Sequence, residues 1–250
     1  MLSTEILKEY IATFYGYGNW VTSKFWFIGI EEGGGNKIEN VEKRLESWEL
    51  LGKHDLIDCY DHHWKMNSYT EQSIKKPHSR TWTRLILTKL SFQSKNTNTA
   101  DVLNLQLTDW GNLLSDNLLI ELFPLPSPGV KDWFYPDWVD LTSDLSFLKC
   151  RDSYKETVVS NRVKNIKAKV EQHKPSVVLF YGKSQQDHWN DIIGTTDLKM
   201  ITLSGHTIRH IYSNKTLFIQ CPQPSYIRGY AFWKDLGIKI QQLLEISTNY

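Results

Sequence analysis

Four short, almost entirely apolar runs constrain the fold of this chain more than any other feature. They occupy residues 24–30 (KFWFIGI), 117–123 (NLLIELF), 176–181 (SVVLFY) and 215–220 (KTLFIQ). Runs of this length without polar alternation are typical of strands buried on both faces, as in the parallel sheets of α/β proteins. The stretches between them carry apolar residues at helical spacing. Strands that alternate with helices predict a mostly parallel sheet covered on both faces.

The helical pattern is clearest over residues 152–173, which end shortly before Pro175. Another helix is predicted to begin after Ser79, whose hydroxyl suits the N-cap position. Two polar or aromatic stretches, near 52–79 and 129–150, are predicted to be insertions in the domain. We therefore expect a single domain over residues 1–250, with a three-layer α/β/α arrangement around a central, mostly parallel four-stranded sheet. The other predicted elements are helices at 3–15, 39–51, 184–193 and 230–246 and a hairpin at 199–203 and 207–212.

The composition is that of a globular protein and excludes several classes. The chain has 250 residues, of which 40% are hydrophobic and 23% charged, and its net charge is only +1. A nucleic-acid-binding face would therefore be a local patch. The three cysteines are far apart and form no CxxC pair, which favours a cytoplasmic location over a disulfide framework. We expect no signal peptide, no membrane contact, no cofactor and no obligatory protein partner.

The carboxyl ends of parallel strands are where α/β proteins bind ligands, so three loops are candidates for the site. The first follows residues 24–30 and places Glu31 and Glu32 before three glycines. Taken alone, this loop is better explained as a solvated turn with two surface glutamates. In the second, Glu121 is the only charge near the end of an apolar strand. A buried carboxylate needs a partner or a function, and an ion pair with an arginine is the alternative explanation.

The third loop follows the last core strand and contains Pro222, Gln223, Pro224 and Ser225. Two prolines make such a turn rigid, so that it can hold the glutamine and the serine in place. Tyr226, Ile227 and Arg228 come next, and an aromatic or apolar wedge beside an arginine suits contact with a nucleic acid. A plain connection between a strand and a helix is the alternative.

Taken in order, these three loops resemble the motifs of the uracil-DNA glycosylase superfamily. The segment GIEEG at 29–33 stands where that family has a Gly-x-Asp-Pro or Gly-x-Asn-Pro motif. Glu121 stands in place of its base-reading asparagine, and the triplet QPS at 223–225 in place of its His-Pro-Ser. The segment VVLFYGKSQQ at 177–186 is similar to the family's strand–helix unit. The likeness extends over about 24–246, excluding the two insertions.

The resemblance implies a monofunctional DNA glycosylase, which flips a nucleotide out of the duplex and hydrolyses its N-glycosidic bond to leave an abasic site. Glu31, with Glu32 as the reserve candidate, would position the attacking water. Gln223 would contact the departing base. Glu121 would read the base, with Tyr60, Trp64, Tyr69 or Phe123 as candidates for aromatic contact with it. The expected DNA contacts are Ser127, Lys183, Ser184, Ser225, Tyr226, Ile227 and Arg228, with Tyr226 or Ile227 as the wedge.

The departure at Glu121 bears on the substrate. An ionised carboxylate accepts hydrogen bonds but cannot donate them, and acidic side chains are known to accept from the amine of cytosine. A protonated carboxyl could instead donate to ring nitrogen 3. Both states favour a cytosine-type base over uracil. Because excision of plain cytosine would destroy a cell's own genome, the expected target is a modified cytosine, or another modified base found in foreign DNA such as phage DNA.

Three other interpretations remain open. The chain can be a catalytically inactive member of the fold that binds DNA or a protein. It can also be a metal-dependent nuclease that uses Glu31 and Glu32 with Asp61, His62 and His63. We expect no metal there, because adjacent ligand-type residues point in different directions and no second half of a site is evident. The third interpretation is an unrelated α/β enzyme whose loops match by chance.

Overall fold

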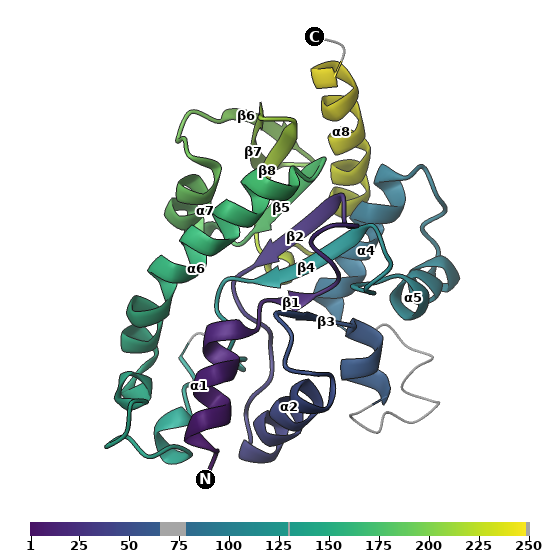
Figure 1. The fold of residues 1–250 in the computed structure, drawn as a ribbon. Coiled ribbons are helices and arrows are strands. Elements are labelled where there is room, and N and C mark those ends of the chain that lie inside the picture. Colours follow the sequence, from purple (N-terminus) through teal and green to yellow (C-terminus); the bar gives the residue numbers. More distant parts are fainter. Residues whose placement is uncertain (66–78, 130, 249–250) are drawn as a thin grey trace.

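The structure of the protein is a computed structural model that describes residues 1–65, 79–129 and 131–248, without the side chains of Trp64, Lys65 and Thr248. Within these residues eight strands form one sheet in the order β3-β1-β4-β2-β5-β8-β7-β6 (Figure 1). Their bounds are β1 Gly16–Tyr17, β2 Phe25–Gly29, β3 Leu56–Ile57, β4 Asn117–Glu121, β5 Val177–Tyr181, β6 Lys199–Leu203, β7 His206–Ser213 and β8 Thr216–Cys221. The described helices are α1 Thr4–Thr13, α2 Ile38–Leu50, α4 Arg80–Phe92, α5 Thr99–Thr108, α6 Arg151–His173, α7 Gln186–Ile193 and α8 Ala231–Thr248.

The predicted α/β fold is confirmed, but the sheet is larger than predicted and is mixed. The four apolar runs form β4, β2, β5 and β8, which are neighbours and run parallel. The hairpin of β6 and β7 joins this group through antiparallel pairing of β7 with β8. On the other side β1 pairs antiparallel with β4, and β3 pairs parallel with β1. The prediction missed β1 and β3 because two residues are too short to show a pattern.

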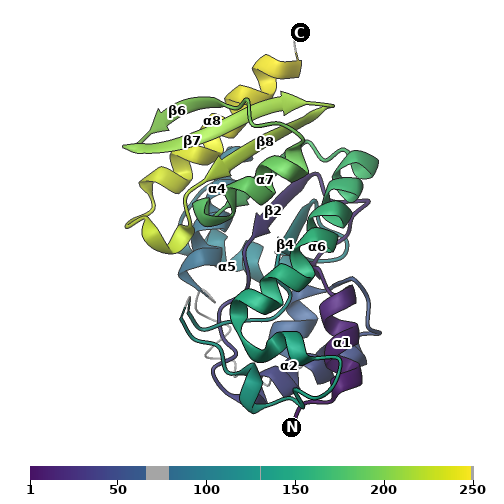
Figure 2. The same cartoon turned by 90° about the vertical axis from the view of Figure 1, so that its left-hand side faces the viewer.

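The helices cover both faces of the sheet (Figures 1 and 2). On β2 the ring of Phe25 lies 5.2 Å from that of Phe92 at the end of α4, whereas Trp26 lies 6.3 Å from His173 at the end of α6. Successive side chains of a strand point to opposite faces, so α4 and α6 lie in different layers. Helix α8 packs on α4, and α7 packs on α6.

Local signals account for the boundaries of two helices that border the site. Ser79 caps α4 as expected, since its hydroxyl accepts a hydrogen bond from the Trp82 N–H at 3.0 Å. Helix α6 ends at His173, where Lys174 adopts a left-handed conformation before Pro175. Helix α5 was not expected, because its polar residues hide the apolar spacing. The first predicted insertion contributes β3 and a π-helical turn, Asp61–Lys65, while the second contains only the 3-10 turns Tyr135–Asp137 and Ser146–Lys149 among its described residues.

The strand register brings the three candidate loops to one edge of the sheet. Gly29, the last residue of β2, lies opposite Glu121, the last of β4, and Tyr181 at the end of β5 lies opposite Cys221 at the end of β8. The first two loops then run side by side, since the Ser127 N–H donates to the Glu32 carbonyl at 3.0 Å. All four strand ends therefore open onto the same side of the molecule.

No helix in the described ranges combines the length and the apolar character that crossing a bilayer requires.

Candidate functional site

A cavity of about 1060 Å³ opens at the carboxyl ends of the four parallel strands. All three candidate loops line it, together with α2, the start of α4 and the start of α6. Its volume lies just above the roughly 300–1,000 Å³ that is usual for pockets holding a small ligand. Glu31, Glu32, Glu121 and Gln223 all border this one space. The predicted convergence of three strand ends is thus present in the structure.

Glu121 is 9% exposed and has no charged partner among the residues described. Its side chain reaches from β4 across Gly29 of β2 to β5, where the Tyr181 hydroxyl donates to Oε1 at 3.0 Å. A side chain at position 29 would collide with both groups, so only glycine permits this contact. Burial, followed by the repulsion from Glu32, raises the pKa of Glu121 from 4.5 to about 8. The carboxyl is therefore mostly protonated at neutral pH.

The alternative explanation for Glu121, an ion pair with an arginine, does not hold in this structure. One candidate, Arg44, pairs with Glu32, and the other, Arg162 of α6, is 3% exposed. Its guanidinium donates to the backbone carbonyls of Phe14, Glu121 and Leu122 at 2.6–3.0 Å and stacks on the Tyr15 ring. Arg162 thus binds backbone carbonyls beside the site and forms no ion pair with the carboxyl of Glu121 in the described structure.

Glu31 forms an ion pair with Arg151, the first residue of α6. Both side chains are about nine-tenths buried, and Arg151 also donates to the Gly129 carbonyl at 2.9 Å. The guanidinium occupies Oε1 of Glu31, while Oε2 is buried without a hydrogen-bond partner in the described structure. One oxygen of this carboxylate is therefore held in place and the other remains available for a small donor such as water.

Glu32 points into a different polar network. It pairs with Arg44 of α2, which also donates to the Tyr17 hydroxyl at 3.2 Å. His63 lies 3.0 Å from the same hydroxyl and 3.9 Å from Oε1 of Glu32. The adjacent acids are thus held by different helices, Glu31 by α6 and Glu32 by α2. Because the carboxylate of Glu32 is engaged in this network, Glu31 is the better candidate for holding water.

The third loop is fixed from both sides. The turn Pro224–Tyr226 is held by Arg84 of α4, whose guanidinium donates to the Pro224 carbonyl at 2.6 Å. Ile227 is only 3% exposed and belongs to the core, so the prediction that it can serve as a wedge is wrong. Tyr226, by contrast, is 77% exposed at the border of the cavity. Of the two wedge candidates, the structure leaves Tyr226.

Three unpartnered oxygens, one on each strand-end loop, distinguish this cavity. They are Glu31 Oε2, Glu121 Oε2 and Gln223 Oε1, all buried and without a hydrogen-bond partner in the part of the chain that is described. Buried polar atoms are almost always hydrogen-bonded, and those that are not call for an explanation such as a ligand or water. A ligand that offers N–H or O–H groups in this cavity fits the arrangement.

The expected DNA contacts are only partly assembled. Lys183, Ser184 and Ser225 are exposed and line the cavity. Arg228 is exposed but lies outside the lining residues. Ser127 also lines the cavity, but it is buried and its hydroxyl contacts the carbonyls of Gly129 and Asp132 at 2.9 Å. The sequence predicted that Ser127 contacts a phosphate, but in the structure its hydroxyl is buried and already hydrogen-bonded.

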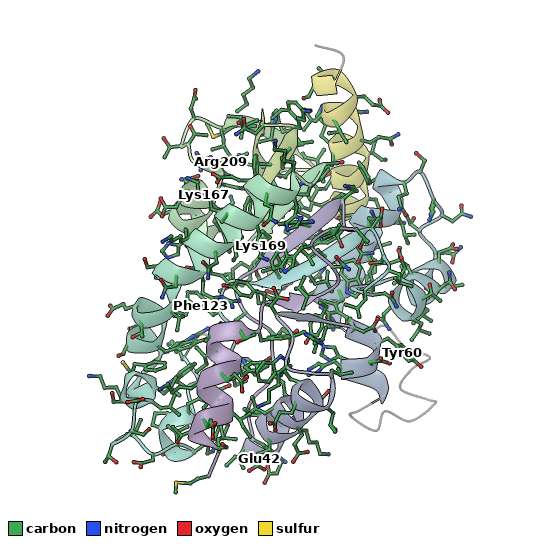
Figure 3. All side chains as sticks on the ribbon, viewed as in Figure 1. Glu42, Tyr60, Phe123, Lys167, Lys169 and Arg209 are labelled. Carbon is green, nitrogen blue, oxygen red and sulfur yellow. The ribbon has the colours of Figure 1, made fainter. Side chains whose placement is uncertain are left out.

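The aromatic candidates for base contact are not brought to the cavity. Phe123 is 1% exposed and packs in the core against Tyr154, because its side chain faces α6. Tyr60 does not line the cavity either, and Figure 3 shows the two residues well apart. The predictions for the Trp64 side chain and for Tyr69 fall outside the described residues. Among the described residues, the tyrosine and tryptophan rings that line the cavity are those of Trp82, Tyr181 and Tyr226.

Sequence reasoning also missed the two arginines that hold the acids, Arg44 and Arg151. Neither stands in a motif, and only the fold brings them to Glu32 and Glu31. The sequence contains only a weak indication of Tyr181: it is a residue with a polar hydroxyl at the end of a predicted buried strand, just before Gly182. That glycine has a φ of +103°, and a side chain there would press on Ile30 and Gln223.

The histidines of the first insertion line the cavity and serve in hydrogen bonds. His62 lies 2.9 Å from the Ser47 hydroxyl, and His63 contacts the Tyr17 hydroxyl. Burial lowers the pKa of His62 well below its ordinary value. Within the ranges that the structure describes, no three His, Cys, Asp or Glu side chains are grouped so as to hold a metal ion.

Comparison with known proteins adds no family to these observations: no protein-family model matches the chain, and no curated protein matches it either.

Proposed function

We propose that the protein is a DNA glycosylase that hydrolyses the N-glycosidic bond of a flipped-out, modified cytosine-type nucleotide. The observation that carries the proposal is the meeting of Glu31, Glu121 and Gln223 around one cavity, each with an unpartnered buried oxygen among the described residues. These are the positions at which the sequence resembles the uracil-DNA glycosylase superfamily. Had they faced separate surfaces, the resemblance would have had no chemical meaning.

In this proposal Glu31 holds the water that attacks the sugar carbon C1′. Its Oε2 accepts a hydrogen bond from the water, while Arg151 fixes the other oxygen. As the glycosidic bond breaks, positive charge develops on the sugar, and the carboxylates of Glu31 and Glu32 offset it. Glu31 then accepts the proton that the water releases.

Glu121 supports a base with an exocyclic amine. In either protonation state one of its oxygens accepts a hydrogen bond, and the amine of cytosine is such a donor. The protonated carboxyl also has one hydrogen to donate, which cytosine accepts at ring nitrogen 3. In the described structure only Oε1 of Glu121 has a hydrogen-bond partner, and Oε2 has none. A cytosine-type base would give both oxygens a partner.

The size of the cavity supports a modified base. At about 1060 Å³ it exceeds what a flat, unmodified pyrimidine needs, and the wall formed by α2 carries polar side chains such as Asn40 and Lys43. A substituent at carbon 5 lies away from the pairing edge that Glu121 reads, so it can extend toward such a wall. Selectivity for a modified cytosine in phage DNA would make the protein a defence enzyme that spares its own genome.

The test is an excision assay on duplexes that each carry one base: uracil, cytosine, 5-methylcytosine, 5-hydroxymethylcytosine, or 5-hydroxymethylcytosine with a polar group on its hydroxyl. The protein is incubated with each duplex in EDTA, and half of every sample is then heated in alkali. We expect strand breaks at a modified cytosine that depend on the alkali, because an abasic site is the product.

Other outcomes identify the alternatives. Breaks without alkali that disappear in EDTA indicate the metal-dependent nuclease. Tight binding without release of any base indicates an inactive DNA-binding member of the fold. Release of uracil at the highest rate would contradict the assignment of Glu121 to a cytosine-type base.

We expect Tyr226→Ala to lower excision from duplex DNA about tenfold and to affect single-stranded DNA little. Tyr226 is exposed at the border of the cavity on a turn held by Arg84, where a ring can replace the base that leaves the stack. A base–aromatic stack is worth ~1–3 kcal/mol, and a single strand has no gap to fill. Excision rates on both forms of the same oligonucleotide measure the difference.

Tyr230→Ala is the matched control, because Tyr230 is 47% exposed but does not border the cavity. It should leave the ratio of the two rates at the wild-type value. Equal losses on duplex and single strand in Tyr226→Ala would show that the ring is not a wedge.

A further inference from the structure

The carboxyl group of Glu121 is placed to do more than recognise a base. It is nine-tenths buried, it borders the cavity, and its Oε2 has no partner among the described residues. Its one hydrogen bond from the described chain comes from the Tyr181 hydroxyl, across the gap that Gly29 leaves in the middle strand. A carboxyl group held at one oxygen and free at the other is oriented toward whatever enters the cavity.

The groups that surround this carboxyl favour its protonated form. Burial and the negative charge of Glu32 raise its pKa, and the hydrogen bond from Tyr181 opposes them only in part. Arg44 is engaged with Glu32 and Tyr17, and Arg162 with backbone carbonyls. The remaining titratable neighbour on this edge, Cys221 of β8, is buried, and burial raises the pKa of its thiol. The charges of Arg44 and Arg162 lower the pKa of Glu121 in part, but neither arginine forms an ion pair with its carboxyl in the described structure, and burial outweighs them.

The leaving base needs a proton that the third loop cannot supply. A cytosine-type base departs with the electron pair of the broken bond on its ring, and protonation turns this poor leaving group into a neutral one. Gln223 can donate a hydrogen bond from its amide but cannot transfer a proton, because an amide does not titrate in this range. Glu121 is a titratable group that borders the same cavity from the end of β4, with β2 and β5 lying between its strand and β8.

We propose that, in the glycosylase reaction proposed above, Glu121 is the general acid that protonates ring nitrogen 3 of the departing cytosine-type base. Its Oε2 carries the proton, and Tyr181 is a positioning residue that orients the carboxyl through Oε1. The inference rests on the proposed function and deepens it. It also gives a chemical reason for the base preference, because nitrogen 3 of uracil already bears a hydrogen and cannot take up a proton.

The step balances in atoms and electrons. The bond between C1′ and ring nitrogen 1 breaks, and its electron pair goes to the base. The proton of Glu121 forms a bond to nitrogen 3, so the base leaves neutral. The water oxygen bonds to C1′ and gives its proton to Glu31. Glu121 ends as a carboxylate, which still accepts the hydrogen bond of Tyr181, and exchange of protons with solvent restores both acids.

The experiment measures kcat/KM against pH from 6 to 10, on the modified-cytosine duplex that the excision assay identifies. For the wild type we expect kcat/KM to fall tenfold per pH unit above about pH 8, where the free protein loses the Glu121 proton. Glu121→Gln keeps the shape of the side chain without its acid. It should lose about 10²-fold at pH 7, and the alkaline fall should disappear.

Tyr181→Phe gives a second, independent readout. Because the hydroxyl's hydrogen bond lowers the pKa of Glu121, its removal should shift the alkaline fall to higher pH. A merely structural role of Tyr181 would lower the rate at every pH and leave the position of the fall unchanged. Glu46→Gln, on the exposed side of α2, is the matched control and should reproduce the wild-type profile.

The outcomes separate this inference from the function on which it rests. Excision by Glu121→Gln at the wild-type rate, or with the alkaline fall intact, overturns the role of Glu121 while the glycosylase stands. A Tyr181→Phe profile that falls at the wild-type pH also contradicts it, even if Glu121→Gln does not fold. A wild-type protein that releases none of the five bases contradicts the proposed function itself.

Discussion

Glu31→Gln is expected to lower the rate of base excision by about 10³-fold or more and to leave binding of the DNA largely intact. The amide keeps the size of the side chain, but it can neither accept a proton from the attacking water nor offset positive charge on the sugar. General base catalysis alone contributes about 10²–10⁴-fold, and loss of the electrostatic contribution adds to this. Single-turnover excision with excess protein separates this chemical step from binding.

Two further variants sharpen this prediction. Glu31→Asp keeps the charge at a shorter reach and should lie between the wild type and Glu31→Gln. Glu32→Gln removes the neighbouring charge, which Arg44 already engages, and should lose less activity than Glu31→Gln. If Glu31→Gln excises at the wild-type rate, Glu31 does not hold the water. If instead Glu32→Gln shows the larger loss of activity, Glu32 rather than Glu31 holds the attacking water.

Glu121→Gln is also expected to change stability, in a way that needs no substrate to observe. We compare the free energy of unfolding of the variant with that of the wild type. This difference should favour the variant by several kcal/mol more at pH 9 than at pH 5. The folded-state pKa of Glu121, about 8, lies above the value of 4.5 for the exposed group, so the folded protein binds the proton more tightly than the unfolded chain. The wild type therefore loses stability as pH rises from about 4.5 to about 8.

The size of this effect follows from the shift in pKa. At ~1.4 kcal/mol per pKa unit, the shift corresponds to about 4–5 kcal/mol as an upper estimate. Glutamine does not titrate, so it avoids the cost of an ionised carboxyl in the cavity. Urea unfolding of wild type and variant at pH 5 and pH 9 measures the difference at each pH. Any change in packing is present at both pH values and cancels.

Glu46→Gln is the control for this measurement too, because the same chemical change is made at an exposed position of α2. Its difference from the wild type should be nearly the same at pH 5 and pH 9. An equally flat result for Glu121→Gln would mean that the carboxyl is already ionised in the folded protein at pH 5, which contradicts a pKa raised by burial.

The sequence predicted the core of this fold well because its signal is local. The four parallel strands were visible as uninterrupted apolar runs, and a lone charge near the end of one of them was enough to single out Glu121. Ser79 was identified as a cap from its hydroxyl and its place before a helical pattern. Patterns of this kind depend on residues that are neighbours in the chain, so they can be recognised from the sequence alone.

The parts of the site that depend on distant contacts were missed. Arg151 and Glu31 form an ion pair although they are 120 positions apart in the chain. No local sequence pattern near either residue indicates that the other is its partner. Phe123 was assigned to the site because it stands just after the end of β4, and Ile227 because it follows the turn of the third loop, yet both are buried in the core. Successive side chains at the end of a buried strand point to opposite faces of the sheet. A shift of one residue therefore decides whether a side chain points to the ligand or into the core.

The cavity is assembled from segments that the ribosome makes at very different times. Glu31 is synthesised early, Glu121 near the middle and Gln223 close to the end, and β8, which carries the last of them to the sheet, pairs with β5 only after most of the chain exists. A nascent or truncated chain that stops before β8 has no complete set of reacting groups. For the glycosylase that we propose, this order of synthesis would be a safeguard, since an unfinished copy could not damage the genome of the cell that makes it.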